Sequence, residues 1–486
     1  MTERMRLNEA NRRWWTLAAM CFALFMVMLD NTVVNVALPS IQDDLHTSLA
    51  GLEWTVNAYT LAFGVLLVTG GRLGDIFGRR RVFLMGVVLF AASSAFIGFS
   101  QSSAWLIAGR ALQGVGAALM MPATLSIITN AFPPHERGKA IGTWAGVSAL
   151  ALAIGPVVGG LLVEHVSWQS IFFINLPVAA VAIIVTRFAT QESRDETVVP
   201  KVDIAGIAAI TVGLTALTLA LVEAGSWGWG SPRILGLLAL SAAGLLAFAQ
   251  IERRVKVPMV DFSFFGSRTF LATNIVAFIV SFSMLGMFFF LTLYMQNVLD
   301  YSPLQAGIRF LPTTLMVIVI APIAGRLTDS IGPRPLITAG LALVAVSLIW
   351  QSFLTPTSGF AFLLPGFVLM GIGIALVMSP MSTAAMNAVD QTKAGVASGI
   401  LSMSRMVGGT LGIAVLGTFI GQAASQADFV SSLGEGLLIG GFIAAAGAIV
   451  AWTLISPELA GGAVRPAPVT GEATPPVERA HETVGA

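Results

Sequence analysis

The sequence has little charge and almost no cysteine. Charged residues make up 10% of the 486 residues, and hydrophobic residues make up 56%, whereas a soluble domain carries roughly a quarter charged residues. Cys21 is the single cysteine, which excludes an intramolecular disulfide and a metal site built from cysteines. None of the four lysines lies in a GxxxxGK phosphate-binding loop, so the sequence gives no case for an ATP-driven pump.

Histidine is also scarce. His46, His135, His165 and His481 all lie in predicted loops or in the C-terminal tail, whereas a membrane-bound enzyme needs a helix-borne cluster of histidines or acids. The net charge of +1 says nothing about partners. We therefore expect no enzymatic activity, no cofactor, no metal and no nucleic-acid partner.

Long apolar runs fill the chain instead. About 20 apolar residues are enough to cross a bilayer as a helix, and the sequence predicts an all-α polytopic membrane protein with fourteen such helices. No small-residue cleavage site follows the first run, which indicates a retained first helix rather than a signal peptide. The helices are expected to start near Trp14, Leu52, Val82, Ala104, Lys139, Trp168, Asp203, Arg233, Phe270, Leu304, Pro335, Phe360, Ser398 and Gly434.

The basic residues predict the orientation. With the N-terminus placed in the cytoplasm, 22 of the 26 Lys and Arg residues fall in segments on the cytoplasmic side. Such a bias sets the topology of membrane proteins. We therefore expect a multi-pass protein of the cell membrane with both termini in the cytoplasm.

An internal repeat predicts the architecture. "GRLGDIFGRR", from Gly71, returns as "GRLTDSIGPR", from Gly325, with six of ten positions identical; "GRALQGVGAALMM" returns as "GFVLMGIGIALVM" at nearly the same spacing. This indicates two six-helix bundles, helices 1–6 and 9–14, with helices 7 and 8 inserted, peripheral to the bundles, and substrate binding between the bundles. The predicted divisions are a cytoplasmic N-terminus (1–13), the first bundle (14–190), a linker with the inserted helices (191–256), the second bundle (257–456) and a disordered cytoplasmic tail (457–486).

The motifs "LDNTVVNVALP", "GRLGDIFGRRR", "RALQGVGAA", "GPVVGG", "SWQSIFFINLP" and "SRMVGGTLGIAVLG" occur in the order typical of one family. Through them the chain resembles the major facilitator superfamily, and within it the fourteen-helix drug:proton antiporters. The resemblance implies a monomeric, proton-coupled exporter of small, mostly hydrophobic or amphipathic drugs that works by alternating access within membrane lipid. Export of an endogenous metabolite, a lipid or a self-produced antibiotic is the alternative, and a facilitator that needs no gradient is the third option.

In the first predicted bundle, Asp30 lies inside the first helix and Arg110 inside the fourth. A charge at the bilayer centre costs roughly 2.5–3.5 kcal/mol on insertion scales, and the repeat has Met284 and Phe367 at the matching places, so the fold does not require either charge. The resemblance puts the proton site at the helix 1 acid. We expect Asp30 to lie in an apolar cavity and to exchange the coupled proton with Arg110 taking part; the alternative is a static contact of Asp30 with Asn31, Asn35 or Arg110.

Two glycine-rich motifs are further candidates. The resemblance implies that the loop after helix 2 is an inner gate latch, although a solvated ion pair is the simpler explanation and Pro333 breaks the pattern in the second copy. In helix 5, the resemblance implies an antiporter motif, where plain packing of small residues is the alternative. The latch residues are Gly71, Asp75, Gly78, Arg79, Arg80 and, in the repeat, Asp329; the antiporter residues are Gly155, Pro156, Gly159 and Gly160.

Polar, aromatic and methionine side chains predict a substrate cavity, because soft surfaces suit varied apolar ligands. Packing against lipid or within the bundle is the alternative for each. The candidates are Asn31, Asn35, Trp54, Asn57, Tyr59, Gln113, Asn274, Met284, Phe288, Tyr294, Gln296 and Arg405. Glu223, next to Trp227 and Trp229, is expected at the outer interface and is the second candidate for the coupling acid.

Overall fold

The structure is a computed structural model that describes residues 9–194, 202–255, 258, 260–389, 394–420 and 425–457. Within these ranges the regular secondary structure is helical throughout, without strands. Thirteen of the described helices are long and apolar enough to span a membrane, or fourteen when the two arms of the bent fifth helix count as one span. The predicted all-α polytopic fold is confirmed. The predicted disordered tail lies, except for its first residue, outside the described residues.

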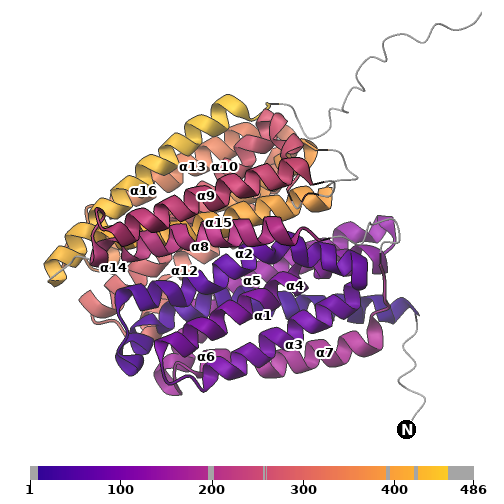
Figure 1. The fold of residues 1–486 in the computed structure, drawn as a ribbon, viewed down its shortest axis with the longest axis horizontal. Helices are drawn as coiled ribbons and strands as arrows, with labels where there is room; N and C mark the ends of the chain where they lie inside the picture. Colours follow the sequence, from indigo (N-terminus) through magenta and orange to yellow (C-terminus); the bar gives the residue numbers. More distant parts are fainter. Residues whose placement is uncertain are drawn as a thin grey trace, which may run out of the picture.

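The first group of helices contains α1 to α7. Helix α4 packs on α2 and α3, while α1 packs on α5 and α7. The group is drawn in indigo and purple in Figure 1. The bounds are α1 (Glu9–Leu45), α2 (Leu49–Phe77), α3 (Arg79–Gly98), α4 (Ser103–Ala131), α5 (Pro134–His165), α6 (Ser170–Phe173) and α7 (Asn175–Ala189).

The second group contains α10 to α16. Helix α10 packs on α15 and α16, and α13 packs on α14 and α16. The bounds are η1 (Phe262–Gly266), α10 (Arg268–Leu293), η2 (Tyr294–Val298), α11 (Pro303–Arg309), α12 (Leu311–Ile331), α13 (Pro333–Gln351), α14 (Phe360–Asn387), α15 (Ala394–Ile420) and α16 (Gln426–Leu454).

Helices α8 (Ile204–Trp227) and α9 (Pro232–Arg254) stand between the two groups in the sequence. They pack on each other, and α8 also packs on α2 of the first group and α15 of the second. In Figure 1, α8 lies along the boundary between the groups, with α9 on its outer side. The predicted peripheral position therefore fits α9. It does not fit α8, which contacts both groups.

The sequence repeat corresponds to a repeated turn. Gly78 ends α2 and precedes α3 with φ of 107°, and Gly332 ends α12 and precedes α13 with φ of 80°. These positive φ values are readily available to glycine and strained for residues with a Cβ. Each turn connects two long helices without any intervening loop.

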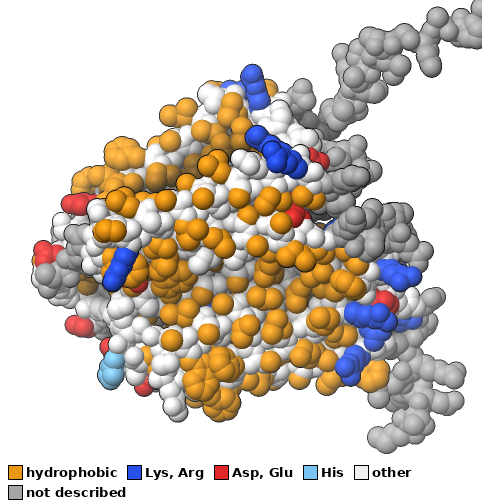
Figure 2. Space-filling view, in the orientation of Figure 1, with side chains coloured by type: hydrophobic (Ala, Val, Ile, Leu, Met, Phe, Trp, Pro, Cys, Tyr) orange, Lys and Arg blue, Asp and Glu red, His pale blue; other side chains and the backbone are white. Residues whose placement is uncertain are grey.

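Charge is distributed unevenly along the molecule. The N-terminal end of α1 and the C-terminal end of α16 lie at the same end of the structure (Figure 1). Figure 2 shows most of the visible Lys and Arg side chains gathered at that end, with hydrophobic side chains covering the middle. This is the pattern expected of a membrane protein with an even number of crossings.

Candidate functional site

Asp30 and Arg110 meet inside the first group of helices. Arg110 Nη1 on α4 lies 2.5 Å from Asp30 Oδ2 on α1, and each residue is only 1% exposed. The guanidinium also donates to Gln113 Oε1 over 2.6 Å. A buried charge needs a counter-charge and hydrogen-bond partners, and each of these two residues supplies the other with both.

Amides complete the surroundings of Asp30. Gln113 Nε2 donates to Asp30 Oδ1 over 2.9 Å, and Asn175 Nδ2 at the start of α7 donates to the same oxygen over 3.4 Å. Both amides also donate to Ser94 Oγ on α3, over 2.9 and 3.2 Å. One network therefore joins four helices of the first group through five polar side chains.

The expectation of an apolar cavity around Asp30 is wrong, because a guanidinium and two amides surround the carboxylate. The alternative, a static contact of Asp30 with Asn31, Asn35 or Arg110, is met for Arg110. Among the described bonds it is not met for the two amides: Asn31 donates to the carbonyl of Val27, and Asn35 to that of Asn31. Both amide side chains therefore donate to backbone carbonyls of their own helix, α1.

Arg110 has further contacts with α2 and α6. Its Nε donates to the carbonyl of Thr55 over 3.0 Å, and its guanidinium carbon lies 4.3 Å from the ring centroid of Tyr59 and 5.9 Å from that of Phe172. Aromatic faces attract cations. The Arg110 guanidinium is therefore held by α2 and α6 as well as by the acid on α1.

Sequence reasoning missed Ser94 and Asn175. Asn175 lies in "SWQSIFFINLP", from which we drew no site residue, and a polar residue between apolar neighbours is the signal that could have found it. Ser94 follows Ser93 in an apolar helix, where serine often bonds to its own backbone, as Ser94 also does with the carbonyl of Phe90.

The predicted latch lies at the turn between α2 and α3. Asp75 pairs with Arg79 one helical turn later, with Nη2 to Oδ1 at 2.9 Å. The backbone N–H of Arg80 donates to Glu192 Oε1 over 3.0 Å, and the Arg80 side chain donates to the carbonyl of Arg187. This turn is therefore attached to the segment after α7. The repeat carries Asp329 on an exposed position of α12.

The glycines of α5 lie against two other helices. A Cβ on Gly155 would overlap Thr32, and one on Gly159 would lie 3.0 Å from the Cα of Val33, both on α1. A Cβ on Gly160 would lie 2.5 Å from the Cα of Leu304 on α11. Gly71, in the latch motif, faces Pro122 of α4 in the same way, at 3.3 Å. Close backbone approach explains glycine at these places.

Residue Pro156 marks a bend in α5. The two arms of the helix, Lys139–Leu152 and Ile154–His165, differ in direction by 41°. Proline removes the hydrogen bond to the carbonyl four residues earlier, here Leu152, and kinks a helix at that point. The carbonyl of Pro156 lies against Gly307 of α11, where a Cβ would overlap it. This part of α5 therefore forms part of the contact between the two groups.

The predicted cavity residues do not form one set. Tyr59 and Gln113 belong to the Asp30 surroundings, whereas Asn57 is fully buried on α2 with neither side-chain polar atom bonded. Trp54, Met284, Phe288 and Arg405 are half-buried, and Arg405 Nε has no hydrogen-bond partner.

Three other candidates on the α10 side have structural contacts. Asn274 accepts a bond from Ser404 of α15 at 2.9 Å, and Gln296 donates to the carbonyl of Val36 of α1 at 2.9 Å. The Tyr294 hydroxyl donates to the carbonyls of Thr355 and Ser358, and its side chain is fully buried. The Tyr294 contact fixes the loop before α14 rather than exposing a ring to a cavity.

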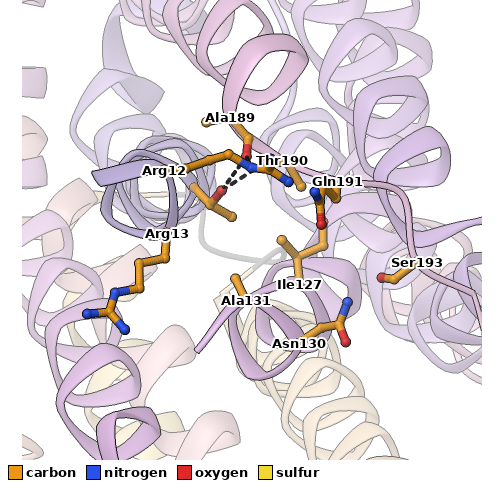
Figure 3. Close-up of a pocket in the computed structure, with 10 residues that line it drawn as sticks. Arg12, Arg13, Ile127, Asn130, Ala131, Ala189, Thr190, Gln191 and Ser193 are labelled. Atoms are coloured by element: carbon orange, nitrogen blue, oxygen red, sulfur yellow. Dashed lines mark hydrogen bonds between the residues drawn. The ribbon is translucent and has the colours of Figure 1, made fainter. Parts of the chain in front are cut away.

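A hollow of about 370 Å³ lies elsewhere, at the end of the molecule where α1 begins (Figure 3). It lies between α1, α4 and the segment after α7, and Arg12 Nε on its wall donates to the carbonyl of Ala189 over 3.1 Å. None of the predicted site residues lines it. Its lining residues are Arg12, Arg13, Thr16, Ile127, Asn130, Ala131, Ala189, Thr190, Gln191 and Ser193.

Residues 20–413 match the model of the Major Facilitator Superfamily. The chain belongs to this superfamily. The match includes the Asp30–Arg110 network, the turn at Gly78 and the bent helix α5, and the chain is a multi-pass membrane protein of this transporter superfamily.

Relatives of known name are transport and resistance proteins. The chain is 40% identical to the tetracenomycin C resistance and export protein of Streptomyces glaucescens, over 84% of this chain and 76% of that protein. It is 37% identical to the multidrug resistance protein Stp of Mycobacterium tuberculosis, over 83% and 75%. It is 35% identical to the cephamycin export protein CmcT of Amycolatopsis lactamdurans, over 97% and 96%.

Proposed function

We propose that this protein exports small hydrophobic or amphipathic drugs from the cytoplasm in exchange for protons. The observation that carries the proposal is a buried acid paired with a buried arginine in the first group of helices. Ionisable residues inside membrane helices commonly mark proton and substrate pathways. The names of the relatives support drugs and antibiotics as the substrate class.

A proton on Asp30 would change the network in a defined way. The proton forms an O–H bond on the carboxyl group, so the pair with Arg110 passes from neutral to a net charge of +1, because arginine stays charged. Arg110 keeps its bonds to the Thr55 carbonyl and to Gln113 but loses its counter-ion. Protonation therefore weakens the link between α1 and α4, and the groups can rearrange.

The proton gradient would supply the work. One proton that crosses about 100 mV yields roughly 2.3 kcal/mol, and a difference of one pH unit adds about 1.4 kcal/mol. In the proposed cycle, Asp30 takes its proton from the outside and releases it to the cytoplasm. We place both termini in the cytoplasm, because basic residues are concentrated on that side. We take the monomer as the unit that transports.

The test is drug accumulation in everted vesicles with an imposed proton gradient. Asp30→Asn mimics the protonated acid, and the other contacts of Arg110 keep the cation satisfied, so the variant is expected to bind drug and to lose uphill transport. Asp43→Asn, an exposed acid on the same helix, is the matched control and should transport as the wild type does. Uphill transport by Asp30→Asn would refute the proposal.

Export of a self-made antibiotic is the second candidate. CmcT, which aligns over nearly the whole chain, is named for cephamycin export, and the relative from Streptomyces glaucescens is named for tetracenomycin C. A susceptibility screen separates the two. A broad panel of unrelated drugs tolerated by the expressing host supports multidrug export, and protection against a single natural product supports the alternative.

A further inference from the structure

A second buried acid lies on α2, two residues before Thr55, whose carbonyl accepts a bond from Arg110. Glu53 is 1% exposed, and its Oε2 has no hydrogen-bond partner. The carboxyl group packs on the backbone of α15, since a Cβ on Gly417 would overlap Glu53 Oε1. Glu53 therefore lies within the contact between the two groups of helices, at the end opposite the N-terminus.

This contact extends along both helices. Thr60 Oγ1 and Thr410 Oγ1 lie 2.7 Å apart, and a Cβ on Gly64 would lie 2.6 Å from the Cβ of Met406. Glu53 lies near the start of α2 and Gly417 near the end of α15, so the two residues meet at one end of this contact. Any movement that separates α2 from α15 at this end exposes the Glu53 carboxyl group to solvent.

No cation compensates Glu53 from the helices packed around it. Helix α8 contributes an acid, Glu223, that interacts electrostatically with Glu53, and it contributes no cation. The ionisable residue of α15 is Arg405, about three helical turns from Gly417, and that of α4 is Arg110, which is paired with Asp30. Among the described residues, no ion pair involves Glu53.

An ionised carboxylate in such a place is unfavourable. It is excluded from water, it lacks a counter-ion, and a second acid faces it. The neutral acid is therefore favoured while α2 is packed on α15, and the ionised acid is favoured when the two helices are apart and water reaches the carboxyl group. We propose that Glu53 is a second proton-binding residue, which holds a proton while α2 is packed on α15 and releases it to water when the two helices separate.

The proton balance is simple. When the contact opens, the O–H bond of Glu53 breaks and the proton passes to water outside; when it closes, Glu53 takes a proton from the same side. This proposal rests on the proposed alternating-access exporter and adds a second proton step, in which external acid favours the state closed to the outside. The Asp30 proton, in contrast, is the one carried across the membrane.

The experiment measures opening at this end as a function of pH. Cys21→Ala removes the one native cysteine, and spin labels at Asp43→Cys on α1 and Ser431→Cys on α16, both exposed positions, report the separation of the groups. Release of one proton on opening predicts that the ratio of open to closed molecules rises about tenfold per pH unit. Glu53→Gln stays neutral and should lower this slope, and in the Asp30→Asn background, where the other proposed proton site is also neutral, it should leave the ratio independent of pH.

Controls separate this proposal from the exporter proposal. Asp30→Asn should abolish uphill transport while the pH response of the label distance persists, so each proposal can fail alone. Glu435→Gln, an exposed acid on α16, should leave the slope unchanged. A wild-type distance that ignores pH, or an unchanged slope in Glu53→Gln, overturns the role of Glu53. A third outcome also overturns the proton-binding role. If Glu53→Gln loses binding of cationic drugs while the ratio of open to closed molecules keeps its pH dependence, Glu53 binds substrate instead.

Discussion

Single residues determine the chemistry of this protein, and the Asp30–Arg110 pair is the main example. Two buried charges that satisfy each other avoid much of the desolvation cost that each alone would incur. The pair is tied to Gln113 and Asn175, so a change of charge on Asp30 affects α1, α4 and α7 together. Arg110 is thereby a structural partner of the acid, and in the proposed cycle it is also a participant.

We predict that the stability of variants at these two residues is not additive. Arg110→Ala leaves Asp30 as a buried acid without its counter-ion and should lower the free energy of unfolding by about 3–5 kcal/mol. Adding Asp30→Asn removes the uncompensated charge and should recover much of that loss. Thermal unfolding of the purified protein at neutral pH measures both. A double variant less stable than Arg110→Ala would show that the two residues act independently.

The charges could be found in the sequence, but their contact could not. Asp30 and Arg110 are separated by 80 positions, and nothing in either helix fixes how the two rotate against each other. Glu53 was missed for a related reason: it lies near the start of its helix, where an acid is usually solvated, and only the packing of α15 and α8 makes it buried.

Individual helices determine how the two groups fit together, and α5 is the clearest case. It contacts α1 through Gly155 and Gly159 and meets α11 through Pro156 and Gly160. One helix therefore joins its own group to the other, through residues that all lie in the arm after the bend, Ile154–His165. Small residues at such a contact let the backbones approach closely.

Adding a methyl group at this contact should separate the helices. In Gly307→Ala the new Cβ would meet the backbone carbonyl of Pro156, which cannot rotate away, so we expect a loss of about 1–3 kcal/mol of stability and reduced transport. Gly236→Ala on α9, where a Cβ meets open space, is the matched control. Equal melting temperatures for the two variants would contradict a tight contact.

Most of the helices could be predicted from sequence, because long apolar runs and basic flanks identify them. The predicted starts at Lys139 and Phe360 fall within the observed α5 and at the first residue of α14. The break between α6 and α7 and the one between α11 and α12 were not predicted, since a change of direction within an apolar run leaves hydrophobicity unchanged.

At the scale of the whole molecule, two groups of helices are joined by the inserted pair α8 and α9. Removing residues 203–254 deletes two crossings, so the remaining helices should keep their orientation. Because α8 packs on both α2 and α15, we expect the shortened protein to unfold at a lower temperature. Labelling of Asp43→Cys and Ser431→Cys from opposite sides of the membrane would contradict the preserved orientation.

Because of the position of α8, the two sides of the transporter differ in how much of the contact between the groups faces lipid. The groups meet along two seams, α2 with α15 and α5 with α11 and α12, and in the described part of the chain the inserted helices cover only the first. A molecule dissolved in the bilayer would therefore reach the second seam directly, whereas α8 shields the first. A lipophilic photoprobe should label α5 and α11 in preference to α2 and α15, and equal labelling of both seams would rule out such one-sided entry.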